Sequence, residues 1–437
     1  MPDTGLTEGS ARSQARASAR FGRRPRILVL RFEYFLEREI LAALACLDAE
    51  VRVFSPASEE EKTSAGYAQA LLAATASFKP HFLLSVNLLG ADPEGRMFEV
   101  MARLGVAWAI WLVDSPELFL HGAASPLPGR ASFFCCDPDH AAKFAAMGLA
   151  NSHALPLACD HTRFDLTAPV DLGPHPERDR FQVSFLGATW VEKLAACHRD
   201  FRFPAGVLRG FTAVARDLAE QAMDQMKGLA TVGAGQATPQ AASPVLAEFC
   251  ADRHPGFWQQ CLELDAPMRR GVLHLLCWEA NRVYRLACVR TILPFAPLIA
   301  GDRHWVRALG DPAGRYLHHP PIAYYGTDLA RFYRLARVNF CCSGVQMPRA
   351  LTQRAFDIPA SGALALLDYR DQLAECFEIG QEVACYRTLE EVPELVERYS
   401  RDRDAAKKII EAGRKRIAAE HTYRHRLERM IGVMREG

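Results

Sequence analysis

Three stretches of this sequence place charged or polar residues where they could bind or process a ligand. In the first, Gly187 directly follows the predicted strand Phe181–Leu186, and Lys193 follows six residues later. A glycine at a strand end lets backbone amides approach a phosphate, and a lysine at the start of the next helix adds a point charge. A turn glycine beside a surface lysine gives the same pattern, so this stretch indicates a phosphate site only together with further signals.

The second stretch runs from Gln353 to Gly362 and is typical of a helix that leads into a strand. Arg354 and Asp357 lie three residues apart, so they share a helix face and could hold a nucleotide, with the acid accepting from ribose hydroxyls. The alternative is a surface ion pair. We expect the residues before this helix to lie at its N-terminus, where an anion is favoured; they are Ser343, Gly344 and Gln346.

The third stretch centres on Asp114, which follows the apolar run 108–113 and precedes Ser115-Pro116. A carboxylate at a strand end beside bulky apolar groups is suited to take a proton from the hydroxyl group of a bound substrate that acts as an acceptor. His121, close by in the sequence, would bind the acceptor or act as the base. The alternative for Asp114 is a cap, because Asp before Ser-Pro commonly starts a turn or a helix.

Two Asp-x-Asp triplets, at residues 137–139 and 402–404, match a signature that can hold a divalent metal and a diphosphate. We interpret Asp139 as the cap of the helix that follows, and the second triplet as part of a solvated helix. His318 and His319 stand together in a predicted loop, where adjacent side chains point in different directions. We therefore assign no metal.

The composition limits the classes of protein that remain. A chain of 437 residues is too long for one core and predicts two domains. The 52 basic and 51 acidic residues give a net charge of +1, which offers no reason to bind nucleic acid. The 13 cysteines lack the two-residue gap of a zinc or redox motif. We expect reduced thiols, a cytoplasmic location and no transmembrane segment.

Alternating strand and helix patterns must position these residues. Continuous apolar runs predict buried parallel strands, and their alternation with helices predicts an α/β fold of two doubly wound domains. We expect a disordered tail over residues 1–24, a Rossmann-like domain over 25–166, and a second over 180–420 with a helical insertion at about 194–290. The last segment, 421–437, is predicted to be a helix. Ligands of such sheets bind at the carboxyl ends of the strands.

Several motifs, in this order and spacing, resemble the CgeB-like (spore maturation protein) glycosyltransferases. The segments that carry the resemblance are residues 78–80, 85–90 and 111–116 in the N-terminal half, and residues 339–348, 353–362, 377–383 and 421–427 in the C-terminal half. The resemblance spans most of the chain from about Arg26 and is weakest between 194 and 271.

The resemblance implies a GT-B-like fold, with the two domains facing each other across a cleft. It also implies metal-independent transfer of a sugar from a nucleotide-diphosphate sugar, bound mainly by the C-terminal domain, to a glycan or protein acceptor. Gly187, Lys193, Arg354 and Asp357 fall where the family contacts donor phosphates and ribose. The helix from about His421 would cross back to the N-terminal domain. No cofactor is expected beyond the donor substrate.

The chain departs from the family at a few positions. Asp357 stands where relatives usually have Glu, and Ser361 where they have Cys. Leu88 and Ser115 replace a His and an Asp that relatives tend to show. A non-catalytic scaffold with the same fold, or a sugar-nucleotide epimerase, therefore stays open beside the transferase. A dinucleotide dehydrogenase is disfavoured because no strand ends in a Gly-x-Gly-x-x-Gly loop.

Overall fold

The computed structural model describes residue 21 and residues 24–56, 64–92, 95–118, 131–167, 178–231, 246–310, 316–326 and 328–436. The chain divides into two units, the first formed by Met1–Pro156 with Thr422–Gly437 and the second by Leu157–His421. Most of the tail predicted at 1–24 lies outside the described residues. Among the helices that are described, none is both long and apolar enough to cross a lipid bilayer.

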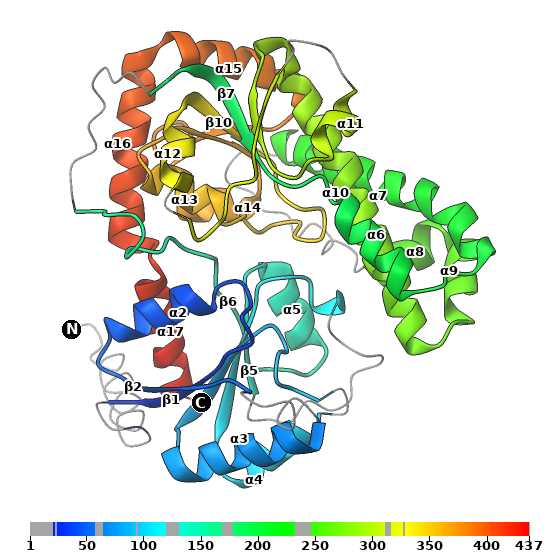
Figure 1. The fold of residues 1–437 in the computed structure, drawn as a ribbon, viewed down its shortest axis with the longest axis vertical. Helices are drawn as coiled ribbons and strands as arrows, with labels where there is room; N and C mark the ends of the chain where they lie inside the picture. Colours follow the sequence, from blue (N-terminus) through cyan, green and yellow to red (C-terminus); the bar gives the residue numbers. More distant parts are fainter. Residues whose placement is uncertain are drawn as a thin grey trace, which may run out of the picture. The chain divides into compact units, whose positions relative to one another are not determined.

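The first unit is built on a parallel sheet of six strands in the order β2-β1-β3-β4-β5-β6 (Figure 1). Its central strands are buried on both faces, which is why they read as continuous apolar runs. The strands are β1 (Arg26–Leu30), β2 (Glu50–Phe54), β3 (Phe82–Val86), β4 (Ala107–Leu112), β5 (Ala131–Cys135) and β6 (Ser152–Ala154).

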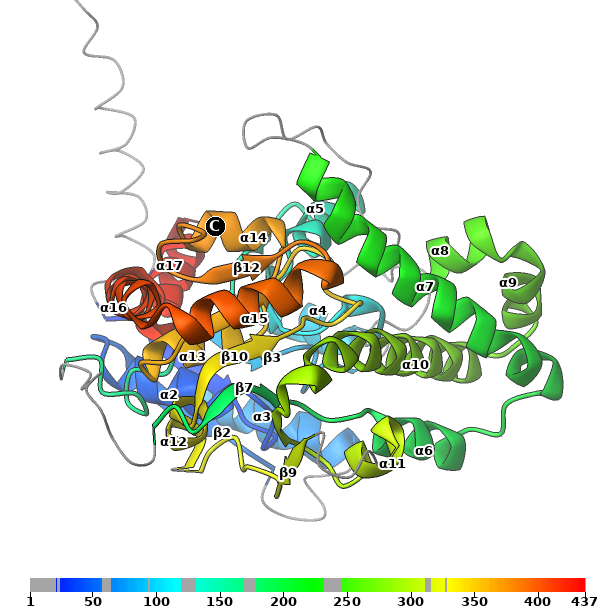
Figure 2. The ribbon, with the colours of Figure 1, turned by 90° about the horizontal axis from the view of Figure 1, so that it is seen from above.

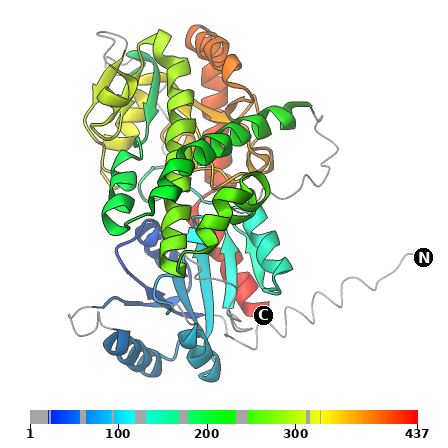
Figure 3. The ribbon, with the colours of Figure 1, turned by 90° about the vertical axis from the view of Figure 1, so that its right-hand side faces the viewer.

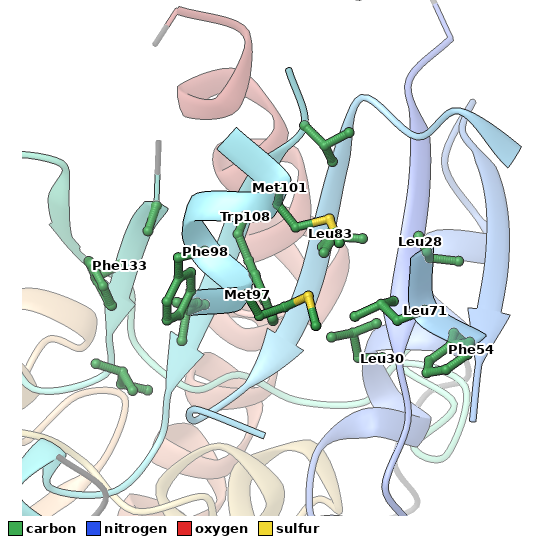
Figure 4. Packing of buried hydrophobic residues seen from close by; sticks show 14 of the residues in the cluster. Leu28, Leu30, Phe54, Leu71, Leu83, Met97, Phe98, Met101, Trp108 and Phe133 are labelled. Carbon is green, nitrogen blue, oxygen red and sulfur yellow. The ribbon is translucent and has the colours of Figure 1, made fainter. Parts of the chain in front are cut away.

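Helices cover both faces of this first sheet. On one face, α3 (Ser64–Phe78), α4 (Arg96–Arg103) and α5 (Pro138–Ala146) pack side chains such as Leu71 and Phe98 against Leu28 and Trp108 (Figure 4). The other helices are α2 (Glu37–Ala45) and α17 (Tyr423–Glu436), which contact each other, and the short helix η1 (Pro116–Leu118).

The last helix, α17, completes the first unit although it comes from the far end of the chain. The ring of Tyr423 packs edge-on against Trp111 of β4, with ring centroids 5.8 Å apart. Arg426 donates through Nε to the carbonyl oxygen of Pro156 at 3.0 Å. Both side chains are buried, so α17 is held by an apolar and a polar contact.

The second unit also has a parallel six-stranded sheet, in the order β12-β11-β10-β7-β8-β9. The chain passes from β7 to β8 on one side and later to β10 on the other, so the topological switch point lies between β7 and β10. The strands are β7 (Phe181–Leu186), β8 (Leu298–Ala300), β9 (Leu317–His319), β10 (Ala336–Cys341), β11 (Ala365–Asp368) and β12 (Ala384–Tyr386).

A helical insertion separates β7 from β8. It contains α6 (Val191–Asp200), α7 (Ala205–Thr231), α8 (Leu246–Arg253), α9 (Pro255–Leu262) and α10 (Ala266–Ile292). The two long helices α7 and α10 pack against each other (Figures 2 and 3). Asp265 caps α10, because its Oδ1 accepts from the backbone N–H of Met268 at 2.8 Å.

The remaining helices complete the second unit. α10 packs against α15 (Val392–Arg401), which contacts β7 and β10, while α12 (Asp328–Arg334) and α13 (Arg354–Ala360) also pack on β10. The others are α11 (Trp305–Leu309), α14 (Asp371–Cys376), α16 (Arg403–Glu420), η2 (Leu293–Phe295) and η3 (Leu389–Glu391).

The predicted fold class, two doubly wound α/β units with a helical insertion in the second, is confirmed. The prediction of a loop around His318 and His319 was wrong, because both residues lie in β9 at the edge of the sheet. The strand β12 was not predicted. Residues 384–386 are too few on their own to give a readable strand pattern.

Candidate functional site

The turn after β7 is held tightly against β8. The backbone N–H of Gly187 donates to Ala300 at 2.9 Å, and the Gly187 carbonyl oxygen accepts from Trp305 Nε1 at 2.7 Å. Any Cβ at Gly301 would lie 2.1 Å from that same oxygen, so only glycine fits there. The predicted residue Gly187 therefore lies on a rigid turn at the switch point.

Arg285, on α10, lies beside this turn and was missed by the sequence analysis. Its guanidinium donates through Nη1 to the Ala188 carbonyl oxygen at 2.7 Å, and a Cβ at Gly187 would lie 3.3 Å from the same nitrogen. Its Nε is buried without a hydrogen-bond partner. Only 6% of the residue is exposed, and this burial, with a contribution from Arg354, lowers its pKa.

Arg354 lies at the end of β10, close enough to Arg285 for the two charges to interact. It begins α13, and its Nε donates to Cys341 Sγ at 3.2 Å while Nη2 donates to the Cys342 carbonyl oxygen at 3.0 Å. These are the last residue of β10 and the one after it. Among the described residues, neither Arg354 nor Arg285 forms an ion pair with a carboxylate. A buried arginine and a half-buried arginine thus lie at the switch point without a carboxylate partner among the described residues.

The loop after β10 does not lie at a helix N-terminus, which corrects the prediction for Ser343, Gly344 and Gln346. α13 begins only at Arg354, and it is short. Ser343 instead donates through its N–H and its hydroxyl to Asp368, at 3.0–3.1 Å. Ser343 is therefore engaged within the protein, and its predicted contact with a donor stays a prediction.

Asp368 anchors this loop from β11. Besides Ser343, it accepts from the Tyr284 hydroxyl at 3.1 Å and from Arg370 at 2.9 and 3.0 Å. The Asp368–Arg370 pair is buried, with both side chains 2% exposed. This network fixes the loop by buried polar contacts, which cost free energy if they are broken.

Asp357 is fully buried on α13, and its Oδ1 accepts from Gln353 Nε2 at 2.9 Å. The alternative of a surface ion pair with Arg354 is wrong, because Asp357 is fully buried and the half-buried Arg354 donates to the Cys342 carbonyl oxygen just after β10. The predicted role of Asp357 at the ribose stays a prediction.

Lys193 lies on α6 against two indole rings. Its Nζ is 4.6 Å from the ring centroid of Trp190 and 4.3 Å from that of Trp278, and the two rings stack 4.9 Å apart. The guanidinium of Arg285 is 5.1 Å from the Trp190 ring. Lys193 is therefore near Arg285 and held by cation–π contacts, which adds positive charge to the same region.

One face of α10 connects these parts of the site. Trp278 contacts the Lys193 region, Asn281 hydrogen-bonds to the loop after β10, and Arg285 holds the turn after β7. Their spacing of three and four residues puts them on one helix face. The sequence does hold a signal for Asn281 and Arg285, because these two polar residues stand on a helix face that is otherwise apolar.

In the first unit, Asp114 lies at the carboxyl end of β4. Its Oδ2 accepts from the Tyr34 hydroxyl at 2.9 Å and from Asn87 Nδ2 at 3.3 Å. Burial and the nearby Asp114 raise the pKa of Tyr34, so the phenol remains a donor. The capping alternative is not supported, because no backbone N–H of the described residues donates to the Asp114 side chain. Asn87 also holds the end of β4, since its Oδ1 accepts from the N–H of Val113 at 3.0 Å.

The histidine predicted beside Asp114, His121, lies outside the described residues. A different one, His140 on α5, was missed. Burial is the main cause that lowers its pKa, and the charges of Asp137, Asp139 and Asp114 act in the opposite direction. His140 is thus a titratable group close to Asp114, with the neutral imidazole favoured.

The prediction that Asp139 caps the helix after the first Asp-x-Asp triplet was wrong, because the capping residue is Asp137. Its Oδ1 accepts from the backbone N–H of Asp139 at 2.9 Å at the start of α5. Asp402 caps α16 in the same way, through Ala405. Within the described part of the chain, no group of three or more His, Cys, Asp or Glu side chains is placed to hold a metal ion.

A comparison with protein families gives a match in the C-terminal part of the chain. Residues 285–432 match the model of a family described as glycosyl transferase-like. The matched segment begins at Arg285 and includes Arg354 and the loop after β10. A comparison with curated proteins finds no match. Residues 285–432 are therefore similar to a glycosyl transferase-like family, and they include Arg285, Ser343, Gln346 and Arg354 of the candidate site.

Solved structures of glycosyltransferases are similar over nearly the whole chain. Sucrose-phosphate synthase from Thermosynechococcus elongatus is 12% identical, with 93% of this chain and 97% of that one covered and a TM-score of 0.48. HepE from Anabaena, in complex with UDP and glucose, is 10% identical, with 93% and 98% covered and a TM-score of 0.48. A glycosyltransferase from Rickettsia africae is 9% identical, with 94% and 98% covered and a TM-score of 0.48.

Proposed function

We propose that this protein is a GT-B-type glycosyltransferase that moves a sugar from a nucleotide-diphosphate sugar to an acceptor hydroxyl. The observation that supports this most is the pair of guanidinium groups of Arg285, which is buried, and Arg354, which is half-buried; neither has a carboxylate partner among the described residues. They lie at the switch point of a parallel sheet, where ligands of such sheets bind. The glycosyl transferase-like segment includes both residues.

The energetics favour an anionic ligand at this place. A buried charge without a partner costs several kcal/mol, so proteins seldom retain one without a use. A diphosphate carries two negative charges and forms short, strong hydrogen bonds with guanidinium groups. In the transfer reaction, the same two cations would stabilise the negative charge that develops on the leaving diphosphate. Lys193 would add to this field.

The first unit would supply the acceptor side. We propose that Asp114 takes the proton of the acceptor hydroxyl, with Tyr34 and Asn87 holding its carboxylate by hydrogen bonds. The proposal includes direct, metal-independent transfer in the cytoplasm, membership of the CgeB-like subfamily, and a surface glycan or a protein as acceptor.

Thermal unfolding in the presence of nucleotide sugars tests this function. A panel of UDP-, ADP-, GDP- and dTDP-sugars is measured with the wild type, with Arg285→Met, and with Arg282→Met as control. Arg282 lies on the same helix but is already paired with Glu279. A ligand at a hundred times its dissociation constant stabilises by about 2.7 kcal/mol, an easily measured shift.

We expect one nucleotide sugar to stabilise the wild type and Arg282→Met but not Arg285→Met. Conversion of that donor without an acceptor would indicate the epimerase alternative. If no nucleotide sugar stabilises the wild type, the transferase proposal is wrong and the non-catalytic scaffold remains.

A further inference from the structure

We propose that Asn281 is a positioning residue for donor binding, because it fixes the side-chain amide of Gln346 with Nε2 directed to the donor. The inference rests on the proposed function and adds a residue to the same site. Asn281 lies on α10, is 1% exposed, and contacts the loop after β10.

The orientation of the Asn281 amide is determined by two backbone groups. Its Oδ1 accepts from the backbone N–H of Val345 at 3.0 Å, and its Nδ2 donates to the carbonyl oxygen of Cys277 at 2.9 Å. A backbone N–H can only donate and a carbonyl can only accept. If the Asn281 amide were flipped, both hydrogen bonds would be lost, so its Nδ2 must face the next partner as a donor.

That next partner is Gln346, whose Oε1 lies 2.7 Å from Asn281 Nδ2. Because Asn281 donates, Gln346 must present its oxygen to Asn281 and turn its own NH₂ group away. The Gln346 Nε2 makes no hydrogen bond within the described residues. Gln346 is partly exposed, unlike the buried Asn281, so this NH₂ group is accessible to a ligand.

The loop leaves little room for another arrangement. A Cβ at Gly344 would lie 2.5 Å from Gln346 Oε1 and 3.1 Å from Asn281 Oδ1, so glycine is required for the two amides to meet. An acceptor-rich ligand such as a diphosphate or a sugar is the chemical complement of an outward NH₂ group. The buried Asn281 thus determines that the half-buried Gln346 directs its NH₂ group, and not its oxygen, to the donor.

A double-mutant cycle tests this inference by titration calorimetry with UDP, ADP, GDP and dTDP. Asn281→Asp keeps an acceptor for Val345, but its second oxygen can only accept, so Gln346 must turn its NH₂ group inward and its oxygen outward. We expect the dissociation constant to rise at least about tenfold more in the wild-type background than in Gln346→Leu. The cycle subtracts the repulsion that the new carboxylate itself exerts on the ligand.

A second substitution, Gln346→Glu, covers the case in which Asn281→Asp does not fold. With Asn281 still donating to one carboxylate oxygen, the other oxygen replaces the NH₂ group. Binding should then be at least about tenfold weaker than in Gln346→Leu.

The outcomes separate the inference from the proposed function. Equal effects of Asn281→Asp in both backgrounds, or equal affinities of Gln346→Glu and Gln346→Leu, would overturn the role of Asn281 alone. Absence of binding of every diphosphate to the wild type would overturn the proposed function, and this inference with it.

Discussion

Arg285 donates to the carbonyl oxygen of Ala188 at 2.7 Å and has no carboxylate partner among the described residues. Another arginine, one turn away on the same helix, does have a carboxylate partner. That arginine, Arg282, makes two hydrogen bonds of 2.6 and 2.7 Å with Glu279 on the same helix. The two arginines of α10 therefore have different roles. Arg285→Met should weaken ligand binding with little change in stability, whereas Arg282→Met should lower stability and leave binding unchanged.

We predict that Arg285→Met changes the free energy of unfolding by no more than about 1 kcal/mol, because the lost hydrogen bond is offset by removal of a buried charge. Arg282→Met should cost about 1–3 kcal/mol, because it leaves the buried carboxylate of Glu279 unpaired. Urea unfolding of both variants without ligand measures this. A large loss of stability in Arg285→Met would mean that Arg285 is a structural residue.

The network around Asp368 should be a structural requirement. Asp368→Ala leaves the buried Arg370 without its partner and removes the acceptor of Ser343. Such a change typically costs about 3–5 kcal/mol. Ser343→Ala, as a milder comparison, should cost about 1 kcal/mol. Chemical unfolding checks both values, and equal small losses would contradict the buried network.

Acid should destabilise the first unit. Burial lowers the pKa values of His81, His140 and His153, so the folded state favours neutral imidazoles. The unfolded chain protonates near pH 6.5 and therefore binds more protons in this range. The three histidines should accordingly contribute their whole stabilisation above about pH 6.5, and the free energy of unfolding should decrease as the pH falls below this value.

The variant His140→Gln identifies one contributor to this pH dependence. It lacks the imidazole that resists protonation, so its stability should fall less than that of the wild type between pH 8 and pH 5.5. Urea midpoints at several pH values provide the measurement. A decrease as steep as that of the wild type would exclude His140 as a contributor.

The close approach of Gly301 to Gly187 predicts a sharp steric effect. A Cβ at Gly301 would lie 2.1 Å from the Gly187 carbonyl oxygen and 2.7 Å from Trp305 Nε1. Gly301→Ala should therefore displace the turn after β7 and cost about 1–3 kcal/mol.

Gly256→Ala serves as the matched control, because nothing lies within 4 Å of its added Cβ. It should be neutral or stabilise by up to about 1 kcal/mol. Thermal unfolding of the two variants compares them directly. Similar melting temperatures would contradict the packing of the β7 turn.

Much of the fold was predictable because its central strands are buried and rich in apolar residues. The runs 26–30, 107–112 and 181–186 read as strands from local sequence alone. The short edge strand β9, with the residues His318 and His319, was not predictable in this way, since its pairing with β8 depends on the tertiary structure.

The positions of Gly187 and Asp114 were predictable, because a glycine or a charge that comes just after a strand lies at the carboxyl end of the sheet. Arg285 and Asn281 were missed because they lie inside a long helix, more than ninety residues after β7. Only the packing of α10 brings them to the ends of β7 and β10. For Asp357, the helix was predicted correctly, but the spacing of residues in the sequence gave no sign that the side chain is completely buried.

The most direct test of the central claim is the affinity of the wild type and of Arg285→Met for nucleoside diphosphates, measured by titration calorimetry with UDP, ADP, GDP and dTDP. We predict that one of them binds the wild type at a single site and that its dissociation constant rises at least about tenfold in Arg285→Met, as expected for the loss of a charge-assisted hydrogen bond. Binding of the same affinity in both proteins, or no binding to the wild type, would contradict the assignment of Arg285 to a donor diphosphate site.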